Sequence, residues 1–209
     1  MDRVYVKICG LTREEDIDAV NRAMPDYAGF VFAPSRRRIT AGTASRLRAR
    51  LHPAIRSVGV FVDASPEDIL LPLREGIIDM AQLHGHEDEA FVRRIQEQSG
   101  KPVIKAIRAA SGADIDAWQA SAVDHLLLDS GAGSGQPFDW ELAAHCTRPY
   151  FLAGGLHEGN LAQAIARLHP YGVDISSGVE TDGQKDAEKI YRAVALVRNI
   201  PVGKDRERP

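Results

Sequence analysis

Two side chains in this chain of 209 residues stand where an apolar run ends and could move protons. Cys9 comes just before Gly10, and Asp129 follows Leu126-Leu127-Leu128. A thiolate can act as a base or a nucleophile, and a carboxyl group with a raised pKa can act as an acid or a base. The alternatives are a small buried apolar residue for Cys9 and a turn cap for Asp129. Each is therefore a candidate for acid–base chemistry.

Two glycine-containing segments near the C-terminal end have the composition of an anion site. They are Gly154-Gly155 and Ser177-Gly178, and each follows an apolar run. Glycine lets backbone N–H groups approach an anion closely, and a helix N-terminus adds a favourable field. We expect these segments to bind a phosphate, although turn glycines are the alternative.

Three consecutive arginines, Arg36, Arg37 and Arg38, follow another apolar run. A solvated loop is the simplest explanation, but the planar guanidinium group is also the usual bidentate partner of a carboxylate. These residues therefore predict either an exposed loop or a site for an anion.

Three further features are weaker candidates for a catalytic or binding role. His84 and His86 stand beside Glu87 and Asp88 but lack the spacing of common zinc motifs, so we predict no metal site. The stretch 131–135, GAGSG, is not a dinucleotide fingerprint, and we expect a mobile loop over the site. Cys146 lies in a helical stretch and is expected to be buried and inert.

Short apolar runs alternate with helical patterns from end to end, and most of the runs do not alternate in polarity. Such runs are typical of strands buried on both faces of a parallel sheet. The expected strands are Val4–Ile8, Gly29–Phe32, Ser57–Val62, Met80–Leu83, Val103–Ile107, His125–Leu128, Tyr150–Ala153 and Gly172–Ile175.

The helices between these strands have their own start signals. Thr12 begins a capping-box spacing, and Ser65-Pro66 opens another helix with a cap and a first-turn proline. An amphipathic stripe of Ile190, Ala193, Val194 and Val197 predicts a helix near the C-terminus.

Eight strand–helix units of about 26 residues each predict an α/β fold, a single (βα)8 (TIM) barrel. An open doubly wound sheet is the alternative. We expect the barrel to occupy residues 1–200 and a polar tail to occupy 201–209. In a barrel the strand ends carry the site, which adds Lys7, Gln82, His84, Lys105 and Asp174 to the candidates.

Composition narrows the function classes. The net charge of −3 argues against a dedicated nucleic-acid binder, so we expect no nucleic-acid partner. No apolar run approaches the ~20 residues of a membrane helix, and no secretory signal is visible, so no membrane partner is expected. Two cysteines suit a reducing cytoplasm, where we expect the protein to be located.

Taken together, these residues resemble the phosphoribosylanthranilate isomerase family of tryptophan biosynthesis. The resemblance covers roughly Val4 to Val197. It rests on KICGLT at 7–12, GFVFAPSRR at 29–37, GVFV at 59–62, QLHG at 82–85, LLLDS at 126–130, GSGQPFDW at 133–140, AGGL at 153–156 and DISSGVE at 174–180. The arginine segment departs from the family pattern. Its register favours Arg37, with Arg36 or Arg38 as substitutes.

The resemblance implies an Amadori rearrangement of a phosphoribosyl anthranilate, without cofactor or metal. Asp129 matches the family's general acid, which protonates the ring oxygen, and Cys9 matches its general base, which removes the C2′ proton. A thiol is a poor base until its pKa falls, so a positive neighbour is needed; Lys7 or the substrate's iminium group could supply the charge.

The resemblance also implies which residues bind the two ends of this small phosphoribosyl substrate. The glycine segments would hold the phosphate, and Arg37 would hold the anthranilate carboxylate on the opposite side of the mouth. Lys7, Gln82, His84 and Asp174 are expected to contact the remainder of the substrate. The chain is expected to be a monomer or a homodimer.

Two rival functions remain at this point. One is another phosphosugar isomerase, such as the histidine-pathway aminoaldose isomerase, whose pattern would place an aspartate where this chain has Cys9. The other is a catalytically silent phosphate-binding barrel, against which the intact Cys9 and Asp129 argue. Turnover of the candidate substrates separates all three.

Overall fold

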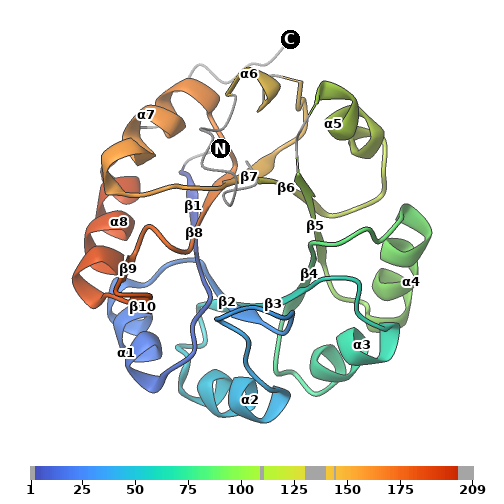
Figure 1. Cartoon of the computed structure of the whole chain (residues 1–209), viewed down its shortest axis with the longest axis horizontal. Helices are drawn as coiled ribbons and strands as arrows, with labels where there is room; N and C mark the ends of the chain where they lie inside the picture. Colours follow the sequence, from blue (N-terminus) through green and yellow to red (C-terminus); the bar gives the residue numbers. More distant parts are fainter. Residues whose placement is uncertain (1–2, 109–110, 130–139, 144, 202–209) are drawn as a thin grey trace.

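Eight parallel strands close into a barrel in the computed structural model, which describes residues 3–108, 111–129, 140–143 and 145–201. Figure 1 shows the ring of strands enclosed by a ring of helices. The strands are β1 (Tyr5–Cys9), β2 (Tyr27–Val31), β3 (Arg56–Phe61), β4 (Met80–Leu83), β5 (Val103–Arg108), β6 (His125–Asp129), β7 (Tyr150–Ala153) and β8 (Gly172–Ile175). Each strand pairs in parallel with its neighbours in chain order, and β8 pairs with β1.

A helix follows every strand within the described residues. The helices are α1 (Glu14–Ala23), α2 (Ala41–Arg50), α3 (Pro66–Arg74), α4 (Glu89–Ser99), α5 (Gly112–Gln119), α6 (Trp140–Ala143), α7 (Glu158–Leu168) and α8 (Ala187–Asn199). The predicted barrel is therefore confirmed, and the open sheet is excluded. Between β8 and α8 the chain forms an unpredicted hairpin of β9 (Glu180–Thr181) and β10 (Gln184–Lys185).

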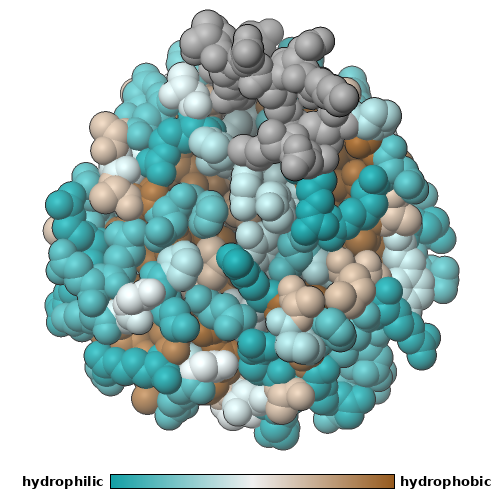
Figure 2. All heavy atoms as spheres, turned by 180° about the vertical axis from the view of Figure 1, so that it is seen from behind, coloured by the Kyte–Doolittle hydropathy of each residue, from teal (hydrophilic) through white to brown (hydrophobic). Residues whose placement is uncertain are grey.

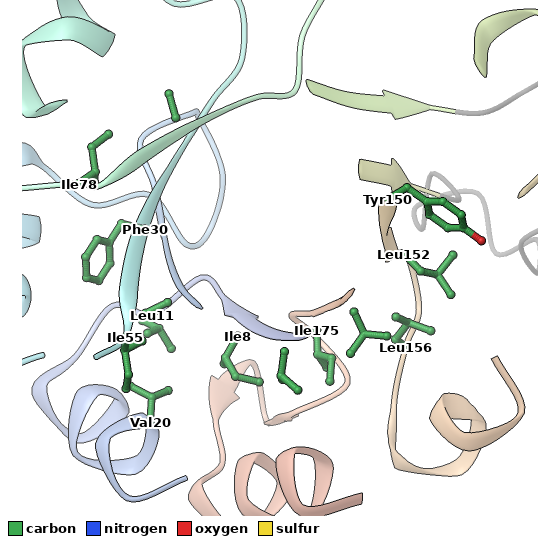
Figure 3. Packing of buried hydrophobic residues seen from close by; sticks show 14 of the residues in the cluster. Ile8, Leu11, Val20, Phe30, Ile55, Ile78, Tyr150, Leu152, Leu156 and Ile175 are labelled. Atoms are coloured by element: carbon green, nitrogen blue, oxygen red, sulfur yellow. The ribbon is translucent and has the colours of Figure 1, made fainter. Parts of the chain in front are cut away.

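Alternate residues of each strand face different layers, because strand side chains alternate with a period of two. One set packs against the helices in a large core, and Figure 3 shows Ile8, Phe30 and Leu152 lying along the barrel wall. The other set fills the barrel interior with a smaller cluster: Tyr27, Val58, Met80, Ile104, Ala106, Leu127, Phe151 and Ala153. Side chains that continue the interior set beyond this cluster reach the mouth at the carboxyl ends of the strands.

Two of the predicted helix signals are confirmed and one is wrong. The Ser65 side chain accepts a hydrogen bond from the backbone of Asp68 at the start of α3, and the apolar stripe of α8 is buried. The first helix, however, is capped at Arg13 and not at Thr12. The carboxylate of Asp16 accepts from the backbone N–H groups of both Thr12 and Arg13, so the reciprocal bond expected at Thr12 does not form.

Hydrophilic side chains cover most of the face shown in Figure 2. Across the part of the chain that the structure describes, no helix is both long and apolar enough to cross a membrane. The expected loop at 131–135 lies outside the described residues, as does the predicted tail except for Pro201. The domain boundaries stay a prediction.

Candidate active site

A cavity of about 480 Å³ opens at the mouth of the barrel. Nine predicted site residues line it: Cys9, Arg37, Gln82, His84, Asp129, Gly154, Gly155, Asp174 and Ser177. The structure therefore brings together residues from five strand ends (β1, β4, β6, β7 and β8) and the loop after β2. The two other residues of the predicted site, Lys7 and Gly178, are not part of this lining.

The thiol of Cys9 lies at the end of β1 in a space that Gly29 leaves open. Gly29 pairs with it on β2, and a Cβ atom at Gly29 would come within 2.7 Å of the Cys9 sulfur. Gly10, at a φ of 82°, leaves the space that the Arg37 side chain occupies. The cysteine is thus confined between a neighbouring strand and an arginine.

Burial raises the pKa of the Cys9 thiol, although the charge of Lys7 opposes that rise. Lys7 does lower the pKa of the thiol, as expected of a positive neighbour, but it does not offset the effect of burial in the unliganded protein. The cation is close enough to favour the thiolate, but the loss of hydration outweighs it, and the negative charge of Asp174 adds to the rise.

Lys7 is completely buried, and its ammonium group donates to the Asp174 carboxylate at 2.9 Å. Burial would lower the pKa of Lys7, but Asp174 and Cys9 outweigh it and the pKa is raised. The other oxygen of Asp174, Oδ1, is buried without a hydrogen-bond partner among the described residues. Because Asp174 and Cys9 line the cavity, the buried Lys7 acts on the site through its pair with this carboxylate and through its charge beside the thiol.

Asp129 receives a contact from His84 across the mouth. The Nε2 atom of His84 lies 3.1 Å from Asp129 Oδ2, and its Nδ1 lies 3.3 Å from the amide nitrogen of Gln82. The roles of the two ring nitrogens depend on the tautomer of His84: with the proton on Nε2, the ring donates to Asp129 and Nδ1 accepts from the Gln82 amide. Gln82 and His84 therefore orient the carboxyl group of Asp129.

The two predicted phosphate segments meet at one rim of the cavity. Gly154 and Gly155 have φ angles of 91° and 62°, which favour glycine. Gly178 pairs with His157, and a Cβ atom at Gly178 would collide with the carbonyl oxygen of Leu156. Gly178 therefore allows the two loops to touch, while Gly154, Gly155 and Ser177 face the cavity.

A helix begins soon after only one of the phosphate segments. Helix α7 starts at Glu158, directly beyond Gly155 and its cap His157. The segment after β8 instead enters the hairpin β9–β10. The helix field that we expected at this site can thus come from α7, but not from the segment that directly follows Ser177.

Of the three arginines, only Arg37 lines the cavity. Its Nε and Nη2 atoms donate to the carboxylate of Glu180 at 2.6 and 2.9 Å. Arg36 also donates to Glu180, and Arg38 lines a separate surface groove. Sequence reasoning missed Glu180, because no local pattern links it to the arginines.

The expected position of Arg37 opposite the phosphate segments is wrong. Strands β8 and β2 both flank β1 in the closed barrel, so the loop after β2 lies beside the segment after β8. Contact between Arg37 and Glu180 joins these two segments directly. The site is therefore more compact than expected.

Strand alternation corrects another candidate. Lys105 on β5 faces the helices, where it is buried and donates to Glu87 at 2.7 Å and to the carbonyl of Gly85. The cation of β5 that lines the cavity is Arg108, which shares the interior face of Ala106. Counting alternate positions from the strand end would have found it.

The histidines near residue 85 do not share a site. His86 is exposed and lies 3.0 Å from Asp63, whereas His84 contacts Asp129. No group of three or more metal-binding side chains comes together within the described residues.

Comparison with known proteins identifies the family. The family model described as N-(5'phosphoribosyl)anthranilate (PRA) isomerase matches residues 6–195. The chain belongs to this family. It is 46% identical over 200 residues to the N-(5'-phosphoribosyl)anthranilate isomerase of Endomicrobium trichonymphae, covering 93% of this chain and 98% of the relative. It is 48% identical over 202 residues to that of Lacticaseibacillus casei, covering 97% and 98%.

Solved structures of the family agree with the fold. The phosphoribosyl anthranilate isomerase of Thermus thermophilus is 37% identical, with a TM-score of 0.83 over 92% of this chain and 97% of that one. A second structure, 36% identical with a TM-score of 0.79, covers 91% of this chain and 96% of the other. That family member is in complex with reduced 1-(o-carboxyphenylamino)-1-deoxyribulose 5-phosphate.

Proposed function

We propose that this chain converts N-(5'-phosphoribosyl)anthranilate into 1-(2-carboxyphenylamino)-1-deoxyribulose 5-phosphate, a step of tryptophan biosynthesis. Membership of the isomerase family supports this reaction. The proposed residue roles rest on one observation: Cys9 on β1 and Asp129 on β6 line the same cavity. These strands are separated by β7 and β8, so the thiol and the carboxyl group approach a bound ligand from different sides.

Asp129 is the general acid of this proposal. Its proton passes to the ring oxygen of the substrate, the bond between that oxygen and C1′ breaks, and the nitrogen lone pair forms an iminium group. His84 keeps the carboxyl group directed into the cavity through the Nε2 contact. A positioned acid of this kind contributes about 10²–10⁴-fold to the rate.

Cys9 is the general base. Its thiolate removes the C2′ proton, and the electrons of that bond neutralise the iminium nitrogen to give an enolamine, which tautomerises to the ketone. Because burial raises the pKa of the free thiol, the positive iminium group supplies the charge that favours the thiolate when the substrate is present. Proton removal is thus coupled to ring opening.

Groups suited to both ends of the substrate line the same cavity. Backbone N–H groups around Gly154, Gly155 and Ser177 are proposed to hold the phosphate, and Arg37 the anthranilate carboxylate. The partly unsatisfied carboxylate of Asp174 is available to a ribose hydroxyl group. Metal and cofactor have no role in this scheme, since each step is a proton transfer.

Turnover by the purified protein tests the proposal. Loss of anthranilate fluorescence is expected with phosphoribosylanthranilate, and no reaction is expected with the histidine-pathway aminoaldose. Binding of the reduced product without any turnover would overturn the catalytic proposal in favour of a silent phosphate-binding barrel.

We further propose a cytoplasmic location and a monomeric or dimeric state. A reducing compartment keeps Cys9 available as a base, and both cysteines are free thiols. The family includes a dimeric phosphoribosylanthranilate isomerase from Thermotoga maritima, of which monomeric forms were generated. Light scattering of the purified protein distinguishes the two states.

A further inference from the structure

Three cations surround one carboxylate beside the mouth of the barrel. Glu180 Oε1 accepts from Arg37 Nε and from Lys185 Nζ, each at 2.6 Å. Its Oε2 accepts from Arg37 Nη2 at 2.9 Å and from Arg36 Nη2 at 2.7 Å. Each oxygen therefore accepts two charge-assisted hydrogen bonds, which occupies the full capacity of the carboxylate.

Glu180 and Lys185 form the buried part of this cluster. Their side chains are only 5% and 2% exposed, whereas that of Arg36 is 58% exposed. Burial would raise the pKa of Glu180, but hydrogen bonds from Arg37 and Lys185 lower it to about 2. Glu180 is thus an anion at every ordinary pH, held by the β9–β10 hairpin.

Only one edge of the Arg37 guanidinium is occupied by this contact. Glu180 takes the Nε and Nη2 side, and Arg37 makes no side-chain hydrogen bond through Nη1 with any described residue. A guanidinium group is a rigid planar fork, so holding one edge fixes the direction of the other. The edge formed by Nη1 and Nη2 can still donate two parallel hydrogen bonds to a second carboxylate.

Charge in the cluster also favours a second anion. Arg36, Arg37 and Lys185 carry three positive charges against the single negative charge of Glu180. Arg37 is the member of this group that lines the cavity together with Cys9. The excess positive charge is therefore presented to a ligand through Arg37.

We propose that Glu180 is a positioning residue that holds Arg37 so that its free edge binds the anthranilate carboxylate. Glu180 does not touch the ligand; it determines where the guanidinium group points. This inference rests on the proposed function, because it assumes that Arg37 binds the carboxylate of the substrate. Selectivity for a carboxylated aromatic amine would then depend on a residue of the β9–β10 hairpin.

Two ligands that differ only in the carboxyl group test this role. The first is reduced 1-(o-carboxyphenylamino)-1-deoxyribulose 5-phosphate, and the second is the same compound made from aniline. Calorimetry gives the ratio of their dissociation constants, which is the selectivity for the carboxylate. In Glu180→Gln we expect this ratio to fall about tenfold, because losing the fixed orientation of the Arg37 fork outweighs the added net positive charge of the cluster. Affinity for the aniline compound should change less than about twofold, within the scatter expected of a site that is not touched.

A double-mutant cycle separates positioning from a general structural role. Arg37→Ala alone should lower the same ratio, and adding Glu180→Gln to it should lower the ratio no further, because the group to be positioned is gone. The matched control is Glu89→Gln, which makes the same change at the exposed pair with Arg93 on α4 and should leave the ratio unchanged.

The possible results are distinguishable. Equal weakening of both ligands in Glu180→Gln, or additive effects in the cycle, would overturn the positioning role alone. Equal binding of both ligands by the unmodified protein would overturn the carboxylate role of Arg37 and the inference with it, while turnover of phosphoribosylanthranilate tests the isomerase function separately. If the Gln variant does not fold, Glu180→Asp decides, because shortening the anchor should still reduce the ratio by about threefold.

Discussion

Replacing Gly29 with alanine is expected to remove most of the activity without adding or removing a polar group. Gly29 lies on β2 beside Cys9, and the new methyl carbon would stand 2.7 Å from the Cys9 sulfur and 3.0 Å from its Cα atom. Non-bonded heavy atoms are comfortable at about 3.5–4.0 Å. The thiol must therefore move by about 1 Å.

A displacement of this size matters because the thiolate has to meet the C2′ proton at a defined distance. A misplacement of about 1 Å can cost on the order of 100-fold in rate. The methyl group also overpacks a closed barrel, and we expect a stability loss of about 1–3 kcal/mol. The expected signature is a large fall in kcat with a folded, somewhat less stable protein.

Steady-state kinetics by anthranilate fluorescence, together with urea unfolding, measures both effects. Gly42→Ala on α2 is the matched control, since its added Cβ would have Thr40 Oγ1 as its nearest neighbour at 4.0 Å. That variant should keep its kcat and gain roughly 0.5–1 kcal/mol in stability. A Gly29→Ala protein with normal kcat would refute the reasoning, because the position of the Cys9 sulfur would not limit the reaction.

Other substitutions test the remaining roles. Cys9→Ser and Asp129→Asn should each lower kcat by about 10²–10⁴-fold while the reduced product still binds, which kinetics and calorimetry check; a normal kcat with chemistry rate-limiting would remove that residue from the mechanism. Arg37→Ala should lower kcat/KM by an amount equivalent to about 1.5–3 kcal/mol of transition-state stabilisation. The kcat/KM of Arg37→Lys should also be lower, because lysine keeps the charge but lacks the planar bidentate guanidinium group. A larger defect on replacing a neighbouring arginine would contradict the assignment. Gly178→Ala should weaken binding of inorganic phosphate by forcing the two loops apart, and unchanged competitive inhibition by phosphate would speak against that. Lys7→Gln should raise the pKa of Cys9 further, because the lost cation favours the thiolate; the pH dependence of Cys9 alkylation should move to higher pH, and a move to lower pH would reverse the sign of the argument.

The chemical groups of the proposed site could be found from the sequence because they stand at the ends of apolar runs. In a parallel barrel each strand delivers its last interior residue to the same mouth, so Cys9, His84 and Asp129 were predicted as neighbours from their positions alone. The barrel itself follows from the same regularity, whereas the family resemblance rests on short motifs at those strand ends. These features are local in sequence, which is why a sequence can show them.

Properties that depend on packing across the barrel needed the tertiary structure. The pKa of the Cys9 thiol is set by a balance between burial and the charges of Lys7 and Asp174, and neither burial nor the 2.9 Å pair can be read from spacing. Whether the Lys105 side chain points into the barrel or toward the helices depended on which face of β5 packs against the helices. A difference of one position decides between the mouth and the helix layer.

Sequence by itself determined the alternation of strands and helices, the residues at the strand ends and the glycines of the proposed phosphate segments. Tertiary structure alone decided that Glu180 holds Arg37 and that the loop after β2 lies beside the segment after β8. The physical reason is that the sheet closes into a barrel. Joining β8 to β1 brings together segments that are 143 residues apart in the chain, and a contact over that separation leaves no periodic or local signal in the sequence.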